Sequence, residues 1–344
     1  GSVTLAWSAP SSSGDANVTG YTVYRSDGEG GEELSTVAYE GSKSVVPSGV
    51  VTGLRGGRLY SFVVSAWSAS GQGNRSAVFQ QSTASPAIDG VTSVAQKTTS
   101  VTLQWSAPNV TTGSAVTTYV VYRDDGVAGS AVTTVGYNAS AAGATLDGLT
   151  GGRAYQFAVS ALSGAGEGDR SVVLSQSTAP GMPGVPASTV QTASSITLSW
   201  TAPLAGSGAA VEGYLVYEPA TATGTAVLRY NSSSSSSGTG SAVATSATIA
   251  ELAGGTSYSY VVSAVSAAGE GDTSVALTQS TAPGLVTAVS STHQSTSSVT
   301  LAWTAPTVPA TSAGSAVLGY KVYRRVVHEL NDVVGSSGTS DTVL

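Results

Sequence analysis

The strongest constraint on the fold of this chain is an internal repeat with a period near 100 residues. A segment of the form T-L-x-W-[ST]-A-P occurs four times, at Trp spacings of 98, 95 and 103, with its Trp at Trp7, Trp105, Trp200 and Trp303. Each copy is followed by Y-x-V-Y, and the first three continue with L-x-G-G-x-x-Y and V-S-A-x-S-x-x-G-x-G. Several markers in one fixed order indicate a tandem array of a single domain type.

The periodicity within each unit predicts β-strands. In residues 100–105 the apolar side chains of Val101, Leu103 and Trp105 alternate with polar ones, and residues 154–162 repeat the alternation. Clusters of Gly, Pro, Ser and Asn separate such runs, and no apolar stripe of helical spacing extends over 11 residues. We therefore expect an all-β chain with roughly seven short strands per repeat, which is a β-sandwich.

The order of these motifs resembles that of the fibronectin type III domain, an immunoglobulin-like β-sandwich. The resemblance implies that the Trp of each repeat fills the core between two sheets. It also implies that the Tyr of L-x-G-G-x-x-Y forms a tyrosine corner, whose hydroxyl bonds to the backbone upstream, at Tyr60, Tyr155 and Tyr258. The pair of glycines departs from the family pattern, where many members have Pro, and we interpret it as a turn variant.

The repeat divides the chain into four units. We place them at residues 1–84, without the first strand A, at 85–181, at 182–283, and at 284–344, which ends before strands E, F and G. We expect the chain to be part of a longer array. The connecting segments are short and partly stiffened by Pro, so the array is expected to form an elongated, semi-rigid rod. A Ser-rich run from Asn231 to Gly240 predicts a flexible loop between strands C′ and E of the third unit.

Composition excludes several classes of protein. The absence of Cys excludes disulfide scaffolds, thiol catalysis and thiolate metal sites. The net charge of −7 gives no basic footprint for a nucleic-acid partner or an anionic membrane. No apolar stretch reaches the length of a transmembrane helix, so we expect no membrane insertion of this segment.

Few residues in the sequence suggest chemistry. Five N-x-[ST] sequons are candidate N-glycosylation sites in a eukaryotic secretory setting: Asn17, Asn74, Asn109, Asn138 and Asn231. The acidic pairs Glu167/Asp169 and Glu270/Asp272 offer too few carboxylates for a Ca²⁺ site, and we interpret them as solvated turns. Trp67 has no aromatic counterpart in the other units, and it either packs within the protein or contacts a sugar or a partner.

The sequence therefore predicts a non-enzymatic protein with no catalytic residues, no metal and no cofactor. Its repetition, low charge and sequons favour a structural segment of an extracellular filament, matrix or cell-surface appendage. Its partners would then be neighbouring copies, other filament or matrix proteins, and glycans. Three alternatives stay open, because the fold hosts many roles. They are an adhesion or receptor ectodomain that binds a protein or glycan, a spacer of a larger secreted carbohydrate-active enzyme, and an intracellular scaffold, against which the sequons and the low charge speak.

Overall fold

A computed structural model describes most of the chain, and its described residues are 1–11, 17–31, 33–41, 44–127, 130–132, 137–139, 141–220, 225–232, 243–307, 314, 316–325 and 342–343. Every regular element in this part of the chain is a β-strand. By their contacts the residues group into two compact units. One holds 1–182, 203–213 and 264–272, and the other holds 183–202, 214–263 and 273–344.

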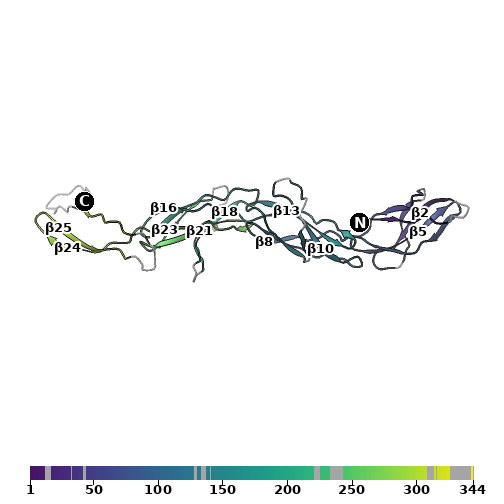
Figure 1. The fold of residues 1–344 in the computed structure, drawn as a ribbon, viewed down its shortest axis with the longest axis horizontal. Coiled ribbons are helices and arrows are strands. Elements are labelled where there is room, and N and C mark those ends of the chain that lie inside the picture. Colours follow the sequence, from purple (N-terminus) through teal and green to yellow (C-terminus); the bar gives the residue numbers. More distant parts are fainter. Residues whose placement is uncertain are drawn as a thin grey trace, which may run out of the picture. The chain divides into compact units, whose positions relative to one another are not determined.

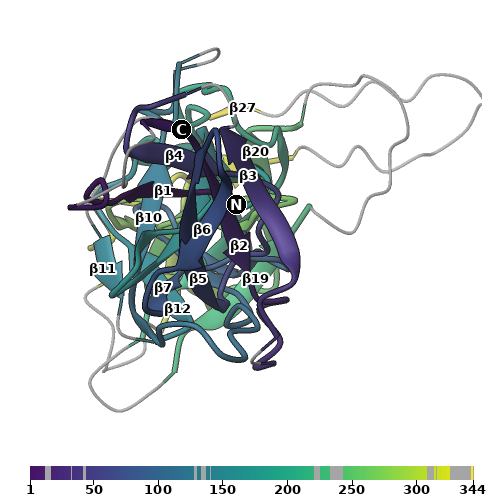
Figure 2. The ribbon, with the colours of Figure 1, turned by 90° about the vertical axis from the view of Figure 1, so that its right-hand side faces the viewer.

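The first sandwich has a two-stranded sheet and a five-stranded sheet, drawn in purple and dark blue in Figures 1 and 2. In the smaller sheet β1 pairs with β4, and in the larger one the order is β3-β2-β5-β6, with β7 also on β5. The strands are β1 (Val3–Ala6), β2 (Val18–Arg25), β3 (Thr36–Gly41), β4 (Ser48–Val51), β5 (Leu59–Ser68), β6 (Gly71–Arg75) and β7 (Phe79–Ser82).

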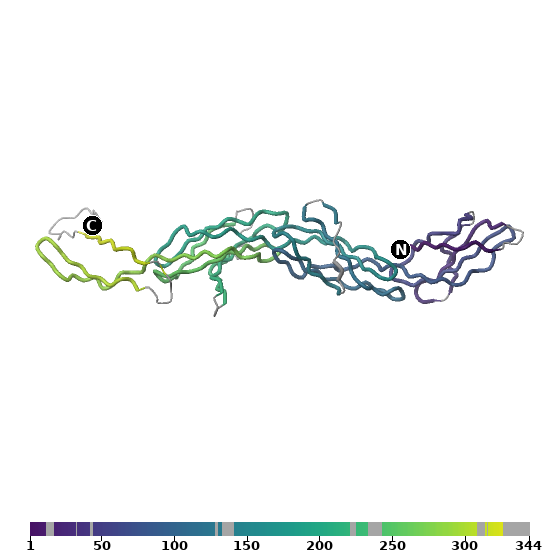
Figure 3. Tube along the Cα trace, viewed as in Figure 1, coloured from purple at the N-terminus to yellow at the C-terminus, as the bar shows by residue number. Residues whose placement is uncertain are grey.

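The second sandwich repeats this pattern and adds a strand. Its smaller sheet has the order β12-β9-β8, and its larger sheet has the order β11-β10-β13-β14 with β15 on β13. All pairs are antiparallel, and the trace can be followed in Figure 3. The strands are β8 (Thr92–Gln96), β9 (Val101–Gln104), β10 (Val116–Arg123), β11 (Tyr137–Ala139), β12 (Gly143–Leu146), β13 (Ala154–Ser163), β14 (Gly166–Glu167) and β15 (Leu174–Ser177).

The third repeat has the same two sheets, in the orders β16-β17-β20 and β19-β18-β21-β22, with β23 on β21. The tandem all-β architecture expected from the repeat is thus confirmed. The Ser-rich loop predicted after Asn231 falls on 233–242, outside the described residues. The strands are β16 (Ala187–Gln191), β17 (Ile196–Ser199), β18 (Val211–Glu218), β19 (Val227–Asn231), β20 (Ser246–Ile249), β21 (Ser257–Ser266), β22 (Gly269–Glu270) and β23 (Leu277–Ser280).

In the fourth repeat the described strands form two separate antiparallel pairs. One pair is β24 (Thr287–Gln294) with β25 (Val299–Thr304), and the other is β26 (Tyr323–Arg324) with β27 (Thr342–Val343). Trp303 is partly exposed and meets the ring of Tyr320 edge-on at 5.2 Å between centroids.

The core of the second sandwich follows the alternation of its strands. Val101 and Leu103 on β9 are buried, and so are all the inward-facing residues of β13 from Tyr155 to Ala161. Trp105 is buried as well and packs edge-on against Tyr119 of the other sheet, with ring centroids 5.4 Å apart. The third repeat has an equivalent pair of buried rings at 5.4 Å. In the first repeat Trp7 meets Tyr21 in the same way but is only partly buried.

Candidate functional site

The turn before the long strand of each of the first three repeats is fixed by a tyrosine hydroxyl. In the first three repeats this hydroxyl accepts a hydrogen bond of 2.8 to 2.9 Å from a backbone N–H five residues upstream. The donor and acceptor residues are Arg55 and Tyr60, Thr150 and Tyr155, and Ala253 and Tyr258. This is the geometry that the resemblance implies for a tyrosine corner, and its role is structural.

A threonine at the end of each repeat binds the same turn. Thr83 Oγ1 donates to the carbonyl of Arg55 at 2.7 Å and accepts from the N–H of Arg58 at 3.1 Å. Thr178 and Thr281 make the same two contacts in the next repeats. The recurring Ser-Thr-Ala segment therefore ties the last strand of each sandwich to its own tyrosine-corner turn.

Polar side chains meet across β2, β5 and β6 of the first sandwich. Gln72 Nε2 donates to Tyr24 OH at 2.7 Å and to Ser65 Oγ at 2.5 Å. The guanidinium of Arg75 lies over the Tyr24 ring at 4.1 Å and donates to the carbonyl of Leu34 at 3.0 Å. The cluster links three strands through side chains, so its hydrogen-bonding groups are used within the domain.

The second sandwich has the same cluster with a carboxylate in place of the amide. Glu167 Oε1 accepts from Ser160 Oγ and from Tyr122 OH, both at 2.5 Å, and Arg170 lies 3.5 Å over the Tyr122 ring. The hydrogen bonds from Ser160 and then from Tyr122 hold the pKa of the Glu167 carboxyl below its usual value, because they stabilise its charged form. Glu167 was predicted to be a solvated turn residue; it is exposed, and it also accepts hydrogen bonds from side chains of two neighbouring strands.

Sequence reasoning did not anticipate these clusters. The available signal was the second Tyr of Y-x-V-Y together with the middle residue of the G-[QE]-G element, which recur in the first three repeats at separations of 48, 45 and 53 residues. The glycine that opens each element has a positive φ, at Gly71, Gly166 and Gly269, as expected of a tight turn. That turn returns the chain onto the long strand and brings the middle residue beside the Tyr.

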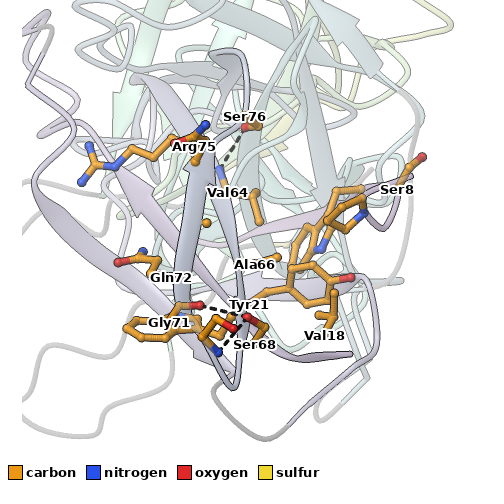
Figure 4. A pocket seen from close by; sticks show the side chains of 16 residues that line it. Ser8, Val18, Tyr21, Val64, Ala66, Ser68, Gly71, Gln72, Arg75 and Ser76 are labelled. Atoms are coloured by element: carbon orange, nitrogen blue, oxygen red, sulfur yellow. Dashed lines mark hydrogen bonds between the residues drawn. The ribbon is translucent and has the colours of Figure 1, made fainter. Parts of the chain in front are cut away.

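A hollow of about 530 Å³ lies in the first sandwich (Figure 4). The residues that line it include Trp7, Val18, Tyr21, Trp67 and Gln72. Trp67 is half-buried, and its Nε1 donates to Thr22 Oγ1 at 2.8 Å. The described residues that line the hollow include no Asp, Glu or His, so it holds no pair of groups for acid–base chemistry.

No group of three or more potential metal ligands occurs among the described residues. Glu270 makes a contact of its own, as Glu167 does. The described part of the chain therefore offers side chains that hold strands together, and we identify no catalytic constellation within it.

The candidate glycosylation sites lie in loops and on short strands. Asn17 and Asn109 are exposed in loops, Asn74 is exposed on β6, and Asn231 is exposed at the end of β19. Asn138 lies on the short strand β11. Attachment of glycans to these residues stays a prediction.

Comparison with known families settles what kind of domain repeats here. The family model described as "Fibronectin type III domain" matches three times, at residues 1–82, 85–177 and 179–280. The chain belongs to the fibronectin type III family. The Trp and tyrosine-corner motifs of this fibronectin type III chain therefore belong to the fold that their resemblance implied.

The curated relatives of this fibronectin type III chain include a chitinase and two glucanases. It is 37% identical over 198 residues to Chitinase A1 of Niallia circulans, covering 54% of this chain and 24% of the relative. It is 30% identical over 241 residues to Exoglucanase B of Cellulomonas fimi, covering 64% of this chain and 20% of the relative. For Endoglucanase B of Cellulomonas fimi the identity is 36% over 172 residues, covering 47% and 15%. The chain thus matches a quarter or less of each relative.

Among solved structures the chain is similar to the FN1–FN3 domains of chicken CNTN1. The sequence identity is 19% and the TM-score is 0.31, with 82% of this chain and 94% of the other covered. A helix long and apolar enough to cross a membrane is not found among the described residues.

Proposed function

We propose that this chain is a non-catalytic spacer segment of a larger secreted protein that acts on a polysaccharide. The observation that carries the proposal is the pattern of coverage. Fibronectin type III matches extend over residues 1–280 with short gaps, while the same chain matches only 24%, 20% and 15% of a chitinase and two glucanases. Fibronectin type III domains are non-catalytic modules, and those relatives are enzymes through other domains.

The geometry of the sandwiches supports this role. Tyr155 and Thr178 bind the same turn, and Glu167 links strands through Ser160 and Tyr122. In the second repeat these polar side chains are thus used in hydrogen bonds within the domain. A segment of this kind separates other domains and sets the distance between them. We place this function ahead of the extracellular filament, because the named relatives are enzymes that act on chitin or glucans.

The first test is mass spectrometry of the native protein isolated from culture medium and from cells. Peptides from this chain should occur in the medium, in one polypeptide with a domain that hydrolyses a polysaccharide. A native polypeptide made only of fibronectin type III repeats, assembled into fibres, would overturn the proposal and favour the extracellular filament instead. Recovery of the protein only from the cell interior would contradict secretion.

The second test uses the native polypeptide with and without residues 1–280. Hydrolysis of a soluble oligosaccharide should stay within about twofold, because the spacer touches no reacting atoms. Solubilisation of the insoluble polysaccharide should fall, because the distance between the joined domains changes. Equal loss on both substrates would show that the segment belongs to the catalytic machinery and would contradict a spacer.

A further inference from the structure

The two glycines of the L-x-G-G turn have different neighbours. A Cβ on Gly56 would lie 2.8 Å from the backbone nitrogen of Pro86, in the segment that leads to the next repeat. The equivalent Gly151 would meet the Cα of Gly181 at 3.0 Å. The second glycine, Gly57, has a φ of +69°, which L side chains rarely adopt. The first glycine therefore permits a close approach of the linker, and the second permits the turn itself.

Both backbone groups of the second glycine are hydrogen-bonded. The N–H of Gly57 donates to the carbonyl of Ala84 at 2.7 Å, which fixes the start of the linker. Its carbonyl accepts from the N–H of Gly113 at 3.2 Å, and Gly113 lies in the loop between β9 and β10 of the second sandwich. The turn of one repeat is thus bonded to a loop of the following repeat within the same compact unit.

The residue before Gly113 strengthens this contact. Thr112 Oγ1 donates to the carbonyl of Gly28 at 3.1 Å and accepts from the N–H of Leu59 at 3.1 Å. Gly28 and Leu59 both belong to the first repeat. One hydroxyl of the second repeat therefore bridges two backbone positions of the first repeat. A Cβ on Gly113 would lie 2.6 Å from the carbonyl carbon of Gly57, so the approach requires glycine.

The same contacts recur 95 to 98 residues later in the sequence. Ser207 Oγ donates to the carbonyl of Gly126 at 3.4 Å and accepts from the N–H of Ala154 at 3.3 Å. Gly208 N–H donates to the carbonyl of Gly152 at 3.0 Å, and a Cβ on Gly208 would lie 2.7 Å from the Gly152 carbonyl carbon. All of these residues group with the first compact unit, including 203–213.

We propose that the L-x-G-G turn is a docking surface for the Thr-Gly or Ser-Gly pair in the β9–β10-type loop of the next repeat. The partner of this surface is another copy of the same domain in the same chain, and recognition is through backbone carbonyls and one hydroxyl. The Gly-Gly departure from the family pattern is then a joint between domains rather than a variant turn. This inference does not depend on the proposed function, because a filament and a spacer would both use such a joint.

The joint is tested in the full chain with Thr112→Val and with the matched control Thr111→Val. Thr111 is exposed and adjacent, and it makes none of the bonds described above. Loss of the bridging hydroxyl should raise the hydrogen-exchange rates of the Leu59 and Gly113 amides about tenfold, since their protection depends on the contact. The control should leave both rates unchanged.

A distance measurement gives a second readout. The chain has no Cys, so spin labels attach only to cysteines that are introduced. We would introduce them as Val50→Cys and Val94→Cys, at exposed positions of the first and second sandwiches. The parent chain should give a narrow distance distribution, and Thr112→Val and Gly113→Ala should broaden it. Thr112→Ser should restore the parent distribution, because Ser207 makes the equivalent bonds in the next joint.

Exchange at the Arg55 amide shows whether the first sandwich still folds, because its bond to Tyr60 lies within that domain. A distance distribution as broad in the parent chain as in the variants would overturn the proposal of a joint between the domains. So would unchanged exchange at Leu59 and Gly113 in a folded Thr112→Val chain.

Discussion

The N–H of Thr150 donates a hydrogen bond of 2.9 Å to the hydroxyl of Tyr155, and this bond lies in a turn that two other segments also contact. Thr178 binds the carbonyl of Thr150 from the last strand of the same sandwich. The glycines at 151 and 152 lie between the two bonded residues. The tyrosine corner thus has two consequences, because it stabilises its own domain and holds in place the glycines at which the next repeat approaches.

Replacing Tyr155 by Phe should destabilise the second sandwich by about 1–3 kcal/mol, because the N–H of Thr150 then loses its acceptor in a partly buried place. Hydrogen exchange of the amides in β13 measures the opening of this domain within the full chain. The matched deletion Tyr122→Phe removes a hydroxyl from the more exposed cluster at Glu167, and its effect should be smaller. A larger loss for Tyr122→Phe would contradict the importance assigned to the corner.

The repeat predicted the fold because its markers are the residues that fix the core. Val101 and Leu103 alternate in sequence and are buried in the structure, as are the inward residues of β13. Yet the same Ser-Val-Thr-Leu pattern in the fourth repeat leaves Val299 60% and Leu301 37% exposed. In the described part of the chain β25 pairs only with β24, whereas β9 lies between β8 and β12. Burial depends on the strands that cover a face, which a local pattern does not contain.

The polar clusters and the glycine contacts could not be predicted from local sequence patterns, for a related reason. Tyr122 and Glu167 are 45 residues apart, and Gly57 and Gly113 are 56 apart, so each contact exists only after the strands have paired. The sequence shows that these residues recur. The sequence does not show on which face of the sheet the side chain of a turn residue lies. Nor does it show that a position requires glycine because the backbone of another segment approaches it.

The stability of the second sandwich should fall as the pH is lowered below about 4.5, the ordinary pKa of a Glu carboxyl. Hydrogen bonds from Ser160 and then Tyr122 lower the pKa of Glu167 in the folded state, so the unfolded state binds the proton first on acidification. The stabilisation is present above pH 4.5 and is lost as the pH falls through the lowered value. An NMR titration of the Glu167 carboxyl measures this directly, and Tyr122→Phe should raise its pKa. An unchanged titration in that variant would contradict the role of the hydroxyl.

Two glycines with nearly the same φ should respond differently to Ala. Gly126 has a φ of +77° and Gly148 a φ of +72°, so both substitutions cost about 1 kcal/mol from the backbone alone. A Cβ on Gly126 would also lie 2.6 Å from the ring of Tyr155, whereas one on Gly148 would meet nothing within 4 Å. Gly126→Ala should therefore be the more destabilising, with a further loss of protection at the Thr150 amide. Equal effects in the hydrogen exchange of β13 would show that the ring moves without cost.

Removing the hydroxyl of Tyr260 should leave the third sandwich as stable as before or make it more stable, by up to about 1 kcal/mol. The equivalent positions of the first two repeats are Phe62 and Phe157, and all three rings are buried. The Tyr260 hydroxyl has no hydrogen-bond partner among the described residues, so burying it costs free energy that a Phe does not. The comparison is Tyr258→Phe two residues away, which removes the acceptor of the Ala253 N–H and should be destabilising.

The same hydroxyl gives the Tyr260→Phe variant a second signature at high pH. Burial raises the pKa of Tyr260 well above its ordinary value of 10.0, so the folded state keeps its proton when the unfolded state loses it. The contribution to stability is complete below pH 10 and falls as the pH rises beyond it. Unfolding in urea at pH 9 and at pH 11 measures this change in the free energy of unfolding. Hydrogen exchange in β21 at pH 9 measures the stability of the third sandwich before the change. Tyr260→Phe should lose less stability across this interval than the parent chain, and an equal loss would show that the hydroxyl is solvated in the folded state.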